Sequence, residues 1–308
     1  MDLTTRELLE LGLDAVDADA SATPNALRDR VLGATVGSAR QLRHPAWAGE
    51  GAAISPLTVF IKGAAELGAM LDTLRPDEWA RPTDVEGVSV RELVAHLVGV
   101  ERYVLGQLGR RPKLLAPTRE DHFPIAREAA ADMADLTGPE VAAEWWSEVS
   151  ELIAVCGPLD PQYEVSYHHL GGSLRGLLVV RSFELWTHGD DIRRALNRPP
   201  NVLDDERLAM MSSDLMGVLN LGMALSGTTQ PGRTARVNLT GSGGASYLVA
   251  LAPGEVAGLP DITITVGTLD LCRLASNRLS SSLLDIDVEG DRTLLEPILV
   301  GATAFAAD

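Results

Sequence analysis

The sequence has very few cysteines. Cys156 and Cys272 are the only ones among 308 residues, they lie far apart, and neither belongs to a Cys-x-x-Cys pair. A disulfide framework and a metal site built from cysteine are therefore excluded. We expect both residues to be buried thiols.

Positive charge and long apolar runs are also scarce. Lys and Arg total 26 against 43 Asp and Glu, for a formal charge of −17, which argues against general binding to nucleic acid or anionic membranes. No uninterrupted apolar stretch suggests a membrane span, and the N-terminus at Met1 and Asp2 is acidic where a secretory signal would be basic. We expect a cytoplasmic protein that binds small molecules in a local pocket. The oligomeric state is not defined by the sequence.

With 45% hydrophobic and 22% charged residues, the chain can bury a substantial core. Its first half is dominated by helical periodicity, with apolar residues every three to four positions. Helix starts are marked by Ser55-Pro56 and by capping boxes at Ser89 and Thr137, each followed three residues later by Glu. Four helices of similar length predict a helical bundle; they cover residues 55–74, 89–104, 137–156 and 173–196.

After residue 230 the pattern changes to alternating and β-branched segments. These predict strands of an antiparallel sheet at 236–240, 246–251, 262–266 and 284–288, with helices at 268–277 and 291–305. A further helix at 204–225 leads into the turn-rich segment 227–232, which we take as the domain boundary. The expected fold is α+β with two domains. We assign 1–50 to a helical N-terminal extension, 51–230 to the bundle and 231–308 to a small α+β domain.

Three side chains in the bundle suggest a metal site. Glu184 and His188 are four residues apart, so they share one helix face, and the surrounding pattern turns that face inward. His96 lies within the apolar stripe of the second helix. Burying these groups without compensation would be costly, and a shared divalent ion would satisfy all three. Two histidines and one carboxylate leave a ligand position open, as in catalytic zinc sites.

The same residues allow simpler interpretations. Glu184 and His188 could form an ordinary contact between successive helical turns, and His96 could be a hydrogen-bonded core residue. Asp191 extends the row and is expected to support His188 from behind, or to pair with Arg194. His168 and His169 are alternative ligands. Iron, nickel or manganese would also suit such ligands.

Other catalytic signatures are absent from the sequence. The segment 171–175 lacks the final glycine of a nucleophile elbow, which disfavours a serine hydrolase. The segment 241–244 lies between predicted strands with no helix behind it, so we interpret it as a turn and not as a phosphate-binding loop.

Three segments resemble a known family. Trp79-Ala80-Arg81-Pro82-Thr83, the stretch from Val88 to Leu97, and the stretch from Phe183 to Leu196 are similar to the mycothiol-dependent maleylpyruvate isomerase family. These proteins are relatives of the DinB-like bundles and carry a C-terminal domain similar to sterol carrier proteins. The resemblance extends over about residues 55–305 and leaves the N-terminal extension outside it.

The resemblance implies a role for individual residues. His96, Glu184 and His188 match the family's metal positions, and the implied metal is zinc. Zinc would bind and deprotonate the thiol of mycothiol, the thiol co-substrate. The thiolate would add to the cis double bond of maleylpyruvate, allow rotation and leave to give the trans isomer. Arg278 is the nearest match to a family arginine that holds the substrate carboxylate, although Asn277 replaces the expected glycine; a surface arginine at a helix end is the alternative.

Two functions follow as hypotheses. The first is a zinc-dependent enzyme that activates mycothiol, either to isomerise a small unsaturated keto acid or to transfer the thiol to an electrophile. The second is a binding or regulatory protein without enzymatic activity, in which the metal only stabilises the bundle and the C-terminal domain holds an apolar ligand. The two hypotheses make different predictions for the metal-free protein. It stays folded but inactive if the metal is catalytic, and it unfolds if the metal is structural.

Overall fold

The chain forms an α+β structure of two compact units. The bundle unit comprises Ser55–Val202, and the sheet unit comprises Leu203–Asp308 together with the N-terminal segment up to Ile54. The helical patterns predicted within residues 1–50 lie outside the described residues, except that Ala39–Leu42 form strand β1. The computed structural model describes residues 39–42, 54–85, 88–110, 123–167, 170–254, 256 and 259–306.

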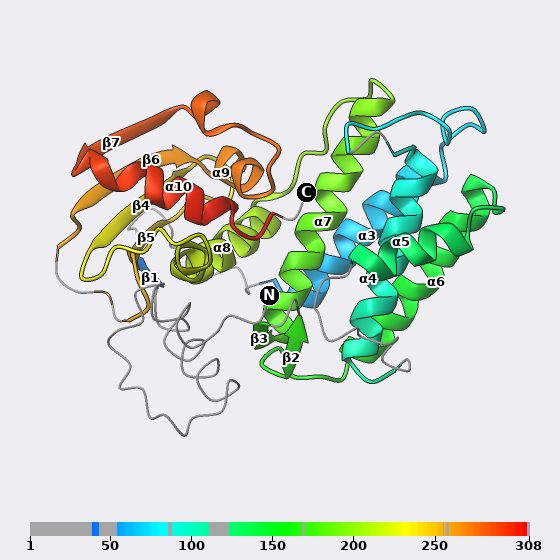
Figure 1. Cartoon of the computed structure of the whole chain (residues 1–308), viewed down its shortest axis with the longest axis horizontal. Helices are drawn as coiled ribbons and strands as arrows, with labels where there is room; N and C mark the ends of the chain where they lie inside the picture. The colour runs from blue at the N-terminus through cyan, green and yellow to red at the C-terminus, as the bar shows by residue number, and fades with distance from the viewer. Residues whose placement is uncertain are drawn as a thin grey trace. The chain divides into compact units, whose positions relative to one another are not determined.

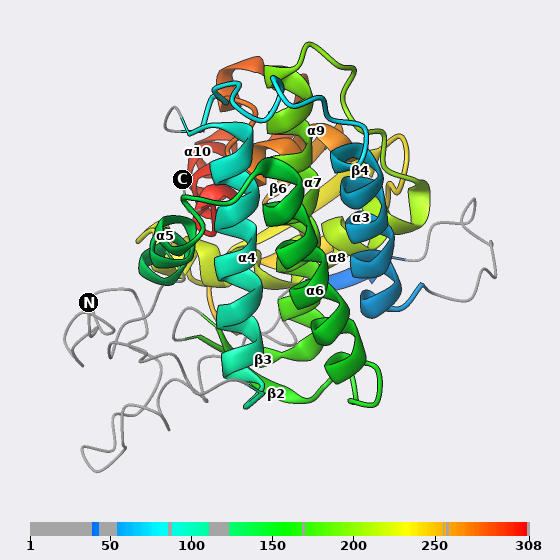
Figure 2. The ribbon, with the colours of Figure 1, turned by 90° about the vertical axis from the view of Figure 1, so that its right-hand side faces the viewer.

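Within its described residues, the bundle unit has four long helices and one shorter helix. Helix α3 packs against α7, and α4 packs against α6, while the shorter α5 covers α4 (Figure 2). The hairpin of β2 and β3 precedes α7. These elements are α3 (Pro56–Leu71), α4 (Val90–Gln107), α5 (Phe123–Asp132), α6 (Gly138–Cys156), β2 (Glu164–Tyr167), β3 (Leu170–Ser173) and α7 (Leu174–Ala195). The four long helices confirm the helices predicted from apolar periodicity, whereas α5 and the β2–β3 hairpin were not predicted.

Helix starts follow the capping signals in the sequence. The Ser55 hydroxyl accepts a hydrogen bond from Thr58 N at 3.0 Å, ahead of Pro56. At Ser89 and Thr137 the glutamate three residues later reaches back to the backbone N–H of the cap residue. Each such contact satisfies a backbone donor that the helix itself leaves unpaired.

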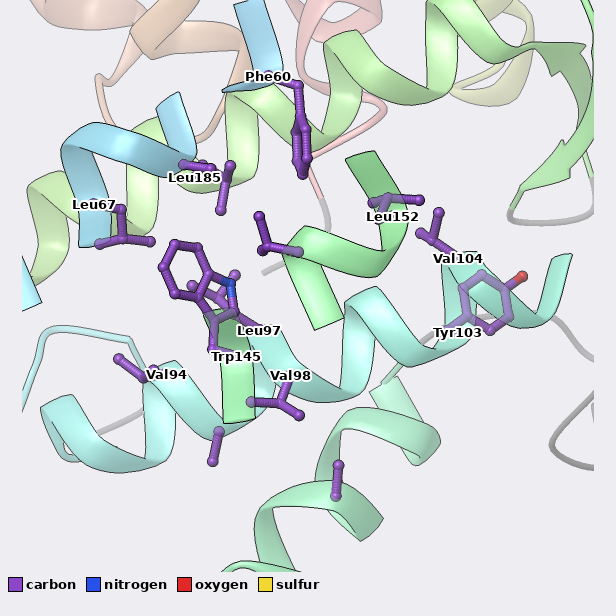
Figure 3. Packing of buried hydrophobic residues seen from close by; sticks show 14 of the residues in the cluster. Phe60, Leu67, Val94, Leu97, Val98, Tyr103, Val104, Trp145, Leu152 and Leu185 are labelled. Carbon is purple, nitrogen blue, oxygen red and sulfur yellow. The ribbon is translucent and has the colours of Figure 1, made fainter. Parts of the chain in front are cut away.

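The bundle interior is closely packed around Trp145. Figure 3 shows its indole ring among Leu67, Leu97 and Leu185, which come from three other helices. Trp145 is 1% exposed and the adjacent Trp146 is 43% exposed, as expected for neighbours on opposite sides of one helix. The apolar core therefore holds the helices that carry the site.

In the described part of the sheet unit, five strands form a sheet in the order β1-β5-β4-β6-β7 (Figure 1). The prediction of a wholly antiparallel sheet was wrong, because β4 and β6 pair in parallel. The alternation of apolar and polar side chains shows which face of a strand is buried, but it does not show the direction of the strand. The parallel pairing is therefore decided by the tertiary structure, in which β6 lies beside β4. The strands are β4 (Thr234–Thr240), β5 (Ser246–Ala250), β6 (Ile262–Gly267) and β7 (Ile286–Gly290).

Helices α8 (Asp205–Leu225), α9 (Thr268–Ala275) and α10 (Leu295–Thr303) complete the sheet unit. We had placed α8 with the bundle and the boundary near residue 230. In the structure α8 packs on β5, α9 and α10, since its apolar face joins the core of the sheet. Among the described residues, helix α8 alone is long and apolar enough to cross a membrane, by length and composition only. However, 67% of that apolar window is buried within the structure, as in the core helix of a folded domain.

Candidate metal centre

Helix α7 carries most of the site and has defined ends. Ser173 caps its start by accepting a hydrogen bond from Gly176 N at 3.3 Å. At the other end Asn197 adopts a left-handed conformation with φ of 53°, and Arg198 N donates to Arg193 O at 2.7 Å. This closure satisfies carbonyl groups of the last turn. The helix is thus held over six turns with one face toward the core.

Helix α4 supplies the remaining ligand candidate. Its capping box joins Ser89 N to Glu92 Oε2 at 2.7 Å and Glu92 N to Ser89 Oγ at 3.3 Å. Hydrogen bonds from the Ser89 hydroxyl and backbone N–H lower the pKa of Glu92 below its usual 4.5. The capped start positions His96 one turn after Glu92, and the His96 ring lies beside that of His188 on α7.

The structure brings together His96, Glu184 and His188. One potential ligand atom from each residue lies within 4.8 Å of those from the other two. The two imidazole rings lie 5.4 Å apart between centroids, at an angle of 82°. A zinc ion bound at roughly 2.0–2.2 Å from each atom holds its ligands about 3–4 Å apart, so small side-chain rotations suffice. Two nitrogens and one carboxylate oxygen suit zinc or a related divalent ion.

Asp191 contacts both His188 and Arg194. Its Oδ2 lies 3.2 Å from His188 Nδ1, and its Oδ1 lies 3.5 Å from Arg194 Nη1. Arg194 in turn contacts Asp84 at 3.3 Å. With Nδ1–H donating to the buried Asp191, the imidazole presents its Nε2 as the potential ligand atom. The role of Asp191 in supporting a metal-bound His188 stays a prediction.

Sequence reasoning missed two charged residues beside Glu184. Arg181 donates from Nη1 to Glu184 Oε2 and from Nη2 to Glu101 Oε1, the latter at 2.8 Å. Arg181 and Glu101 are both 0% exposed. Burial raises the pKa of Glu101, and the adjacent Arg181 opposes this rise. The spacing in the sequence could have indicated Arg181, because residues 181, 184, 188 and 191 lie on one face of α7.

Polarity and burial are reversed at two neighbouring positions of α7. The apolar Val180 is 38% exposed, whereas the charged Arg181 beside it is buried. An arginine is not expected in a core position unless carboxylates pair with it. His168 and His169, the alternative ligands, lie outside the described residues.

Arg278 lies in the sheet unit, after α9. Its backbone N donates to Arg273 O at 2.8 Å, and its Nη1 donates to Ser276 O at 3.1 Å. Asn277 takes a φ of 58°, so it adopts the left-handed conformation for which glycine was expected. Arg278 therefore contacts the end of its helix, and its role in binding a carboxylate stays a prediction.

The two cysteine thiols are buried, as predicted. Burial raises the pKa of Cys156 and that of Cys272 to about 12. At neutral pH neither thiol supplies an appreciable amount of thiolate. Any sulfur nucleophile that acts at the metal centre would have to come from a second molecule.

Two kinds of known protein are similar to this chain. An uncharacterized protein of Mycobacterium tuberculosis, matched in two strains, is 22% identical over 231 residues, 73% of this chain and 86% of that protein. Crystal structures of the mycothiol-dependent maleylpyruvate isomerase and of one of its mutants share the fold, with TM-scores of 0.50 and 0.51 and identities of 15% and 14%. Each match covers 75% of this chain and 91% of the isomerase.

The bundle itself matches a family model. Residues 60–193 match the model of the mycothiol maleylpyruvate isomerase N-terminal domain, and this segment includes His96, Glu184 and His188. The bundle unit of this chain is therefore similar to the mycothiol maleylpyruvate isomerase N-terminal domain.

Proposed function

We propose that this protein is a metal-dependent enzyme that activates the thiol of mycothiol. The observation that carries the proposal is the convergence of His96, Glu184 and His188 within 4.8 Å, inside a domain that matches this family model. The donor set and its spacing fit a divalent ion, and zinc is the metal we favour. A bound zinc ion would supply Lewis acidity that lowers the pKa of a coordinated thiol.

The chain's own residues divide the remaining tasks. His96, Glu184 and His188 would provide three ligands and leave one position for sulfur. Asp191 keeps the His188 ring in one orientation through its contact with Nδ1. The buried Cys156 and Cys272 do not compete as nucleophiles, so the reacting thiolate belongs to mycothiol.

The reaction we favour is isomerisation of a small unsaturated keto acid resembling maleylpyruvate. The thiolate would add to the cis double bond, the resulting single bond would rotate, and loss of the same thiolate would restore the double bond in the trans form. Mycothiol is thus regenerated. If the substrate is an electrophile that keeps the sulfur, the same thiolate would be transferred to it. Analysis of the products distinguishes isomerisation from S-transfer.

The test begins with elemental analysis of the purified full chain, followed by calorimetric titration with mycothiol. The loaded protein is then incubated with mycothiol and maleylpyruvate, and the cis and trans products are separated. Glu184→Gln and His188→Ala are expected to lose the metal and the activity. Glu144→Gln, which changes an exposed carboxylate on α6, is the matched control and retains both. A His188→Ala protein with stoichiometric metal and undiminished turnover contradicts the proposal.

Metal removal separates the enzyme from the metal-stabilised binding protein. We expect the chelated protein to remain folded by circular dichroism and to lose activity until metal is restored, because the apolar core of the bundle does not depend on the ligands. An apoprotein that unfolds on chelation, and a loaded protein that never binds mycothiol, would favour the structural role.

A further inference from the structure

We propose that Arg181 is a positioning residue for the metal centre. In this role it grips one oxygen of Glu184 so that the other oxygen faces the two histidines, and Glu101 holds Arg181 in place. The inference rests on the proposed function only in requiring that the centre bind a divalent ion. It does not depend on the substrate.

The contacts of Arg181 define this arrangement. Its Nη1 bonds Glu184 Oε2 on the same helix, and its Nη2 bonds Glu101 Oε1 on α4. The Arg181 and Glu101 side chains are 0% exposed, whereas that of Glu184 is 18% exposed. The guanidinium is planar and carries its donors in a rigid fork, so binding two carboxylates at once restricts its orientation.

The grip determines how Glu184 can bind a metal. A carboxylate with one oxygen committed to a guanidinium has a single oxygen left to offer as a close ligand. Glu184 would then bind through Oε1 alone, and with His96 and His188 it makes three donor atoms. A freely rotating carboxylate could occupy two positions on the ion and remove the site that the thiol needs.

Charge supports the same role. The Arg181 guanidinium is fully buried and contacts two carboxylates, those of Glu101 and Glu184. Burial favours a neutral assembly, because unpaired charge in a core is costly. Without Glu101, the charge of Arg181 would leave the cluster more positive.

A second arginine on the bundle offers a matched comparison. Arg102 on α4 bonds Glu148 on α6 at 2.8 Å, and Glu148 is nearly buried. This pair joins two helices as the pair of Arg181 and Glu101 does, but Arg102 contacts the carboxylates of Glu144 and Glu148 and not that of Glu184. If ion pairs in this bundle act only on stability, both pairs should behave alike.

The experiment replaces each pair by apolar residues of similar size, which often preserves the fold. One double variant combines Arg181→Met with Glu101→Leu, and the control combines Arg102→Met with Glu148→Leu. Both are stripped of metal and titrated with cobalt(II) alone, with folding followed by circular dichroism. The visible absorption of cobalt(II) reports coordination number, so the readout does not require turnover.

We expect the first double variant to bind cobalt(II) about 10–100-fold more weakly and to show a weaker visible band, because Glu184 rotates toward two-oxygen binding. The control should keep the wild-type affinity and band. Wild-type behaviour in the first variant overturns the proposal, as does an equal change in both variants.

If the first variant does not fold, Arg181→Lys takes its place. Lysine keeps the charge without the planar fork, so we expect weaker cobalt(II) binding than in the wild type; an unchanged affinity and spectrum overturns the proposal. A wild-type chain that binds no cobalt(II) or zinc overturns both this inference and the proposed function. A chain that binds metal and shows the expected variant effect, but never reacts with mycothiol, supports the inference while removing the proposed function.

Discussion

His188 Nδ1 lies 3.2 Å from Asp191 Oδ2, one helical turn further along α7. The carboxylate is 1% exposed and also contacts Arg194, so its position is restrained from two sides. The bond fixes which ring nitrogen of His188 faces the candidate metal centre. Loss of this restraint should therefore affect metal binding before it affects the fold.

We predict that Asp191→Asn weakens zinc binding by about 10–100-fold, since the amide keeps the shape but supports the imidazole less well as a ligand. Competition with a chromophoric chelator measures the affinity. The neighbouring Asp190 accepts a hydrogen bond from Asn201 N at 2.6 Å, away from the histidines. Asp190→Asn should leave zinc affinity unchanged, and equal losses in both variants would contradict the prediction.

The two thiols should be unreactive in the native protein. Because their pKa is raised to about 12, only about one in ten thousand of the Cys156 and Cys272 thiols is ionised at pH 8. Burial also keeps a reagent from reaching the sulfur atoms. Ellman's reagent should label neither thiol within minutes in buffer and both in concentrated urea. Rapid labelling of a native thiol would show that the protein has a nucleophile of its own.

Two glycines on α8 should respond oppositely to a methyl group. A Cβ on Gly222 would lie 2.2 Å from the backbone oxygen of Gly301 on α10, whereas one on Gly217 meets nothing within 4 Å. We expect Gly222→Ala to lower the free energy of unfolding by about 1–3 kcal/mol through the forced separation of the helices. Gly217→Ala should raise it by up to about 1 kcal/mol, because alanine favours the helix. Urea denaturation checks both, and a stabilising Gly222→Ala would refute the close approach.

The capping boxes should make bundle stability depend on pH. Hydrogen bonds from Ser89 lower the pKa of Glu92, and those from Thr137 lower the pKa of Glu140. A carboxylate with a lowered folded pKa stabilises the fold fully above its ordinary pKa of 4.5, and the contribution is lost as pH falls through the folded value.

The double variant Glu92→Gln with Glu140→Gln tests this dependence. It should unfold at lower urea concentration than the wild type at pH 7, and the difference should shrink below pH 4.5. Glu128→Gln, at an exposed helical position outside both caps, should show no such difference. A gap between variant and wild type that persists unchanged into acid would exclude a role for the ionised caps.

Local patterns were sufficient for much of the bundle. Ser55, Ser89 and Thr137 marked helix starts, because a cap depends on residues within one turn of each other. The spacing of Glu184 and His188 placed both on one face for the same reason. His96 was added from its apolar surroundings and from the family resemblance, and the structure brings it to the other two.

Contacts between distant segments were decided by the tertiary structure. Spacing places Arg181 on the face of Glu184, but its pairing with Glu101 on another helix is seen only in the folded chain. The parallel pairing of β4 with β6, and the packing of α8 on the sheet, likewise depend on which apolar faces meet. The sequence alone determined where the four long bundle helices begin and that Glu184 and His188 offer donor atoms on one face, because these features follow from capping and periodicity over a few residues. Only the folded chain decided the partners of those donors, because burial forces charged groups to pair across elements that are remote in the sequence.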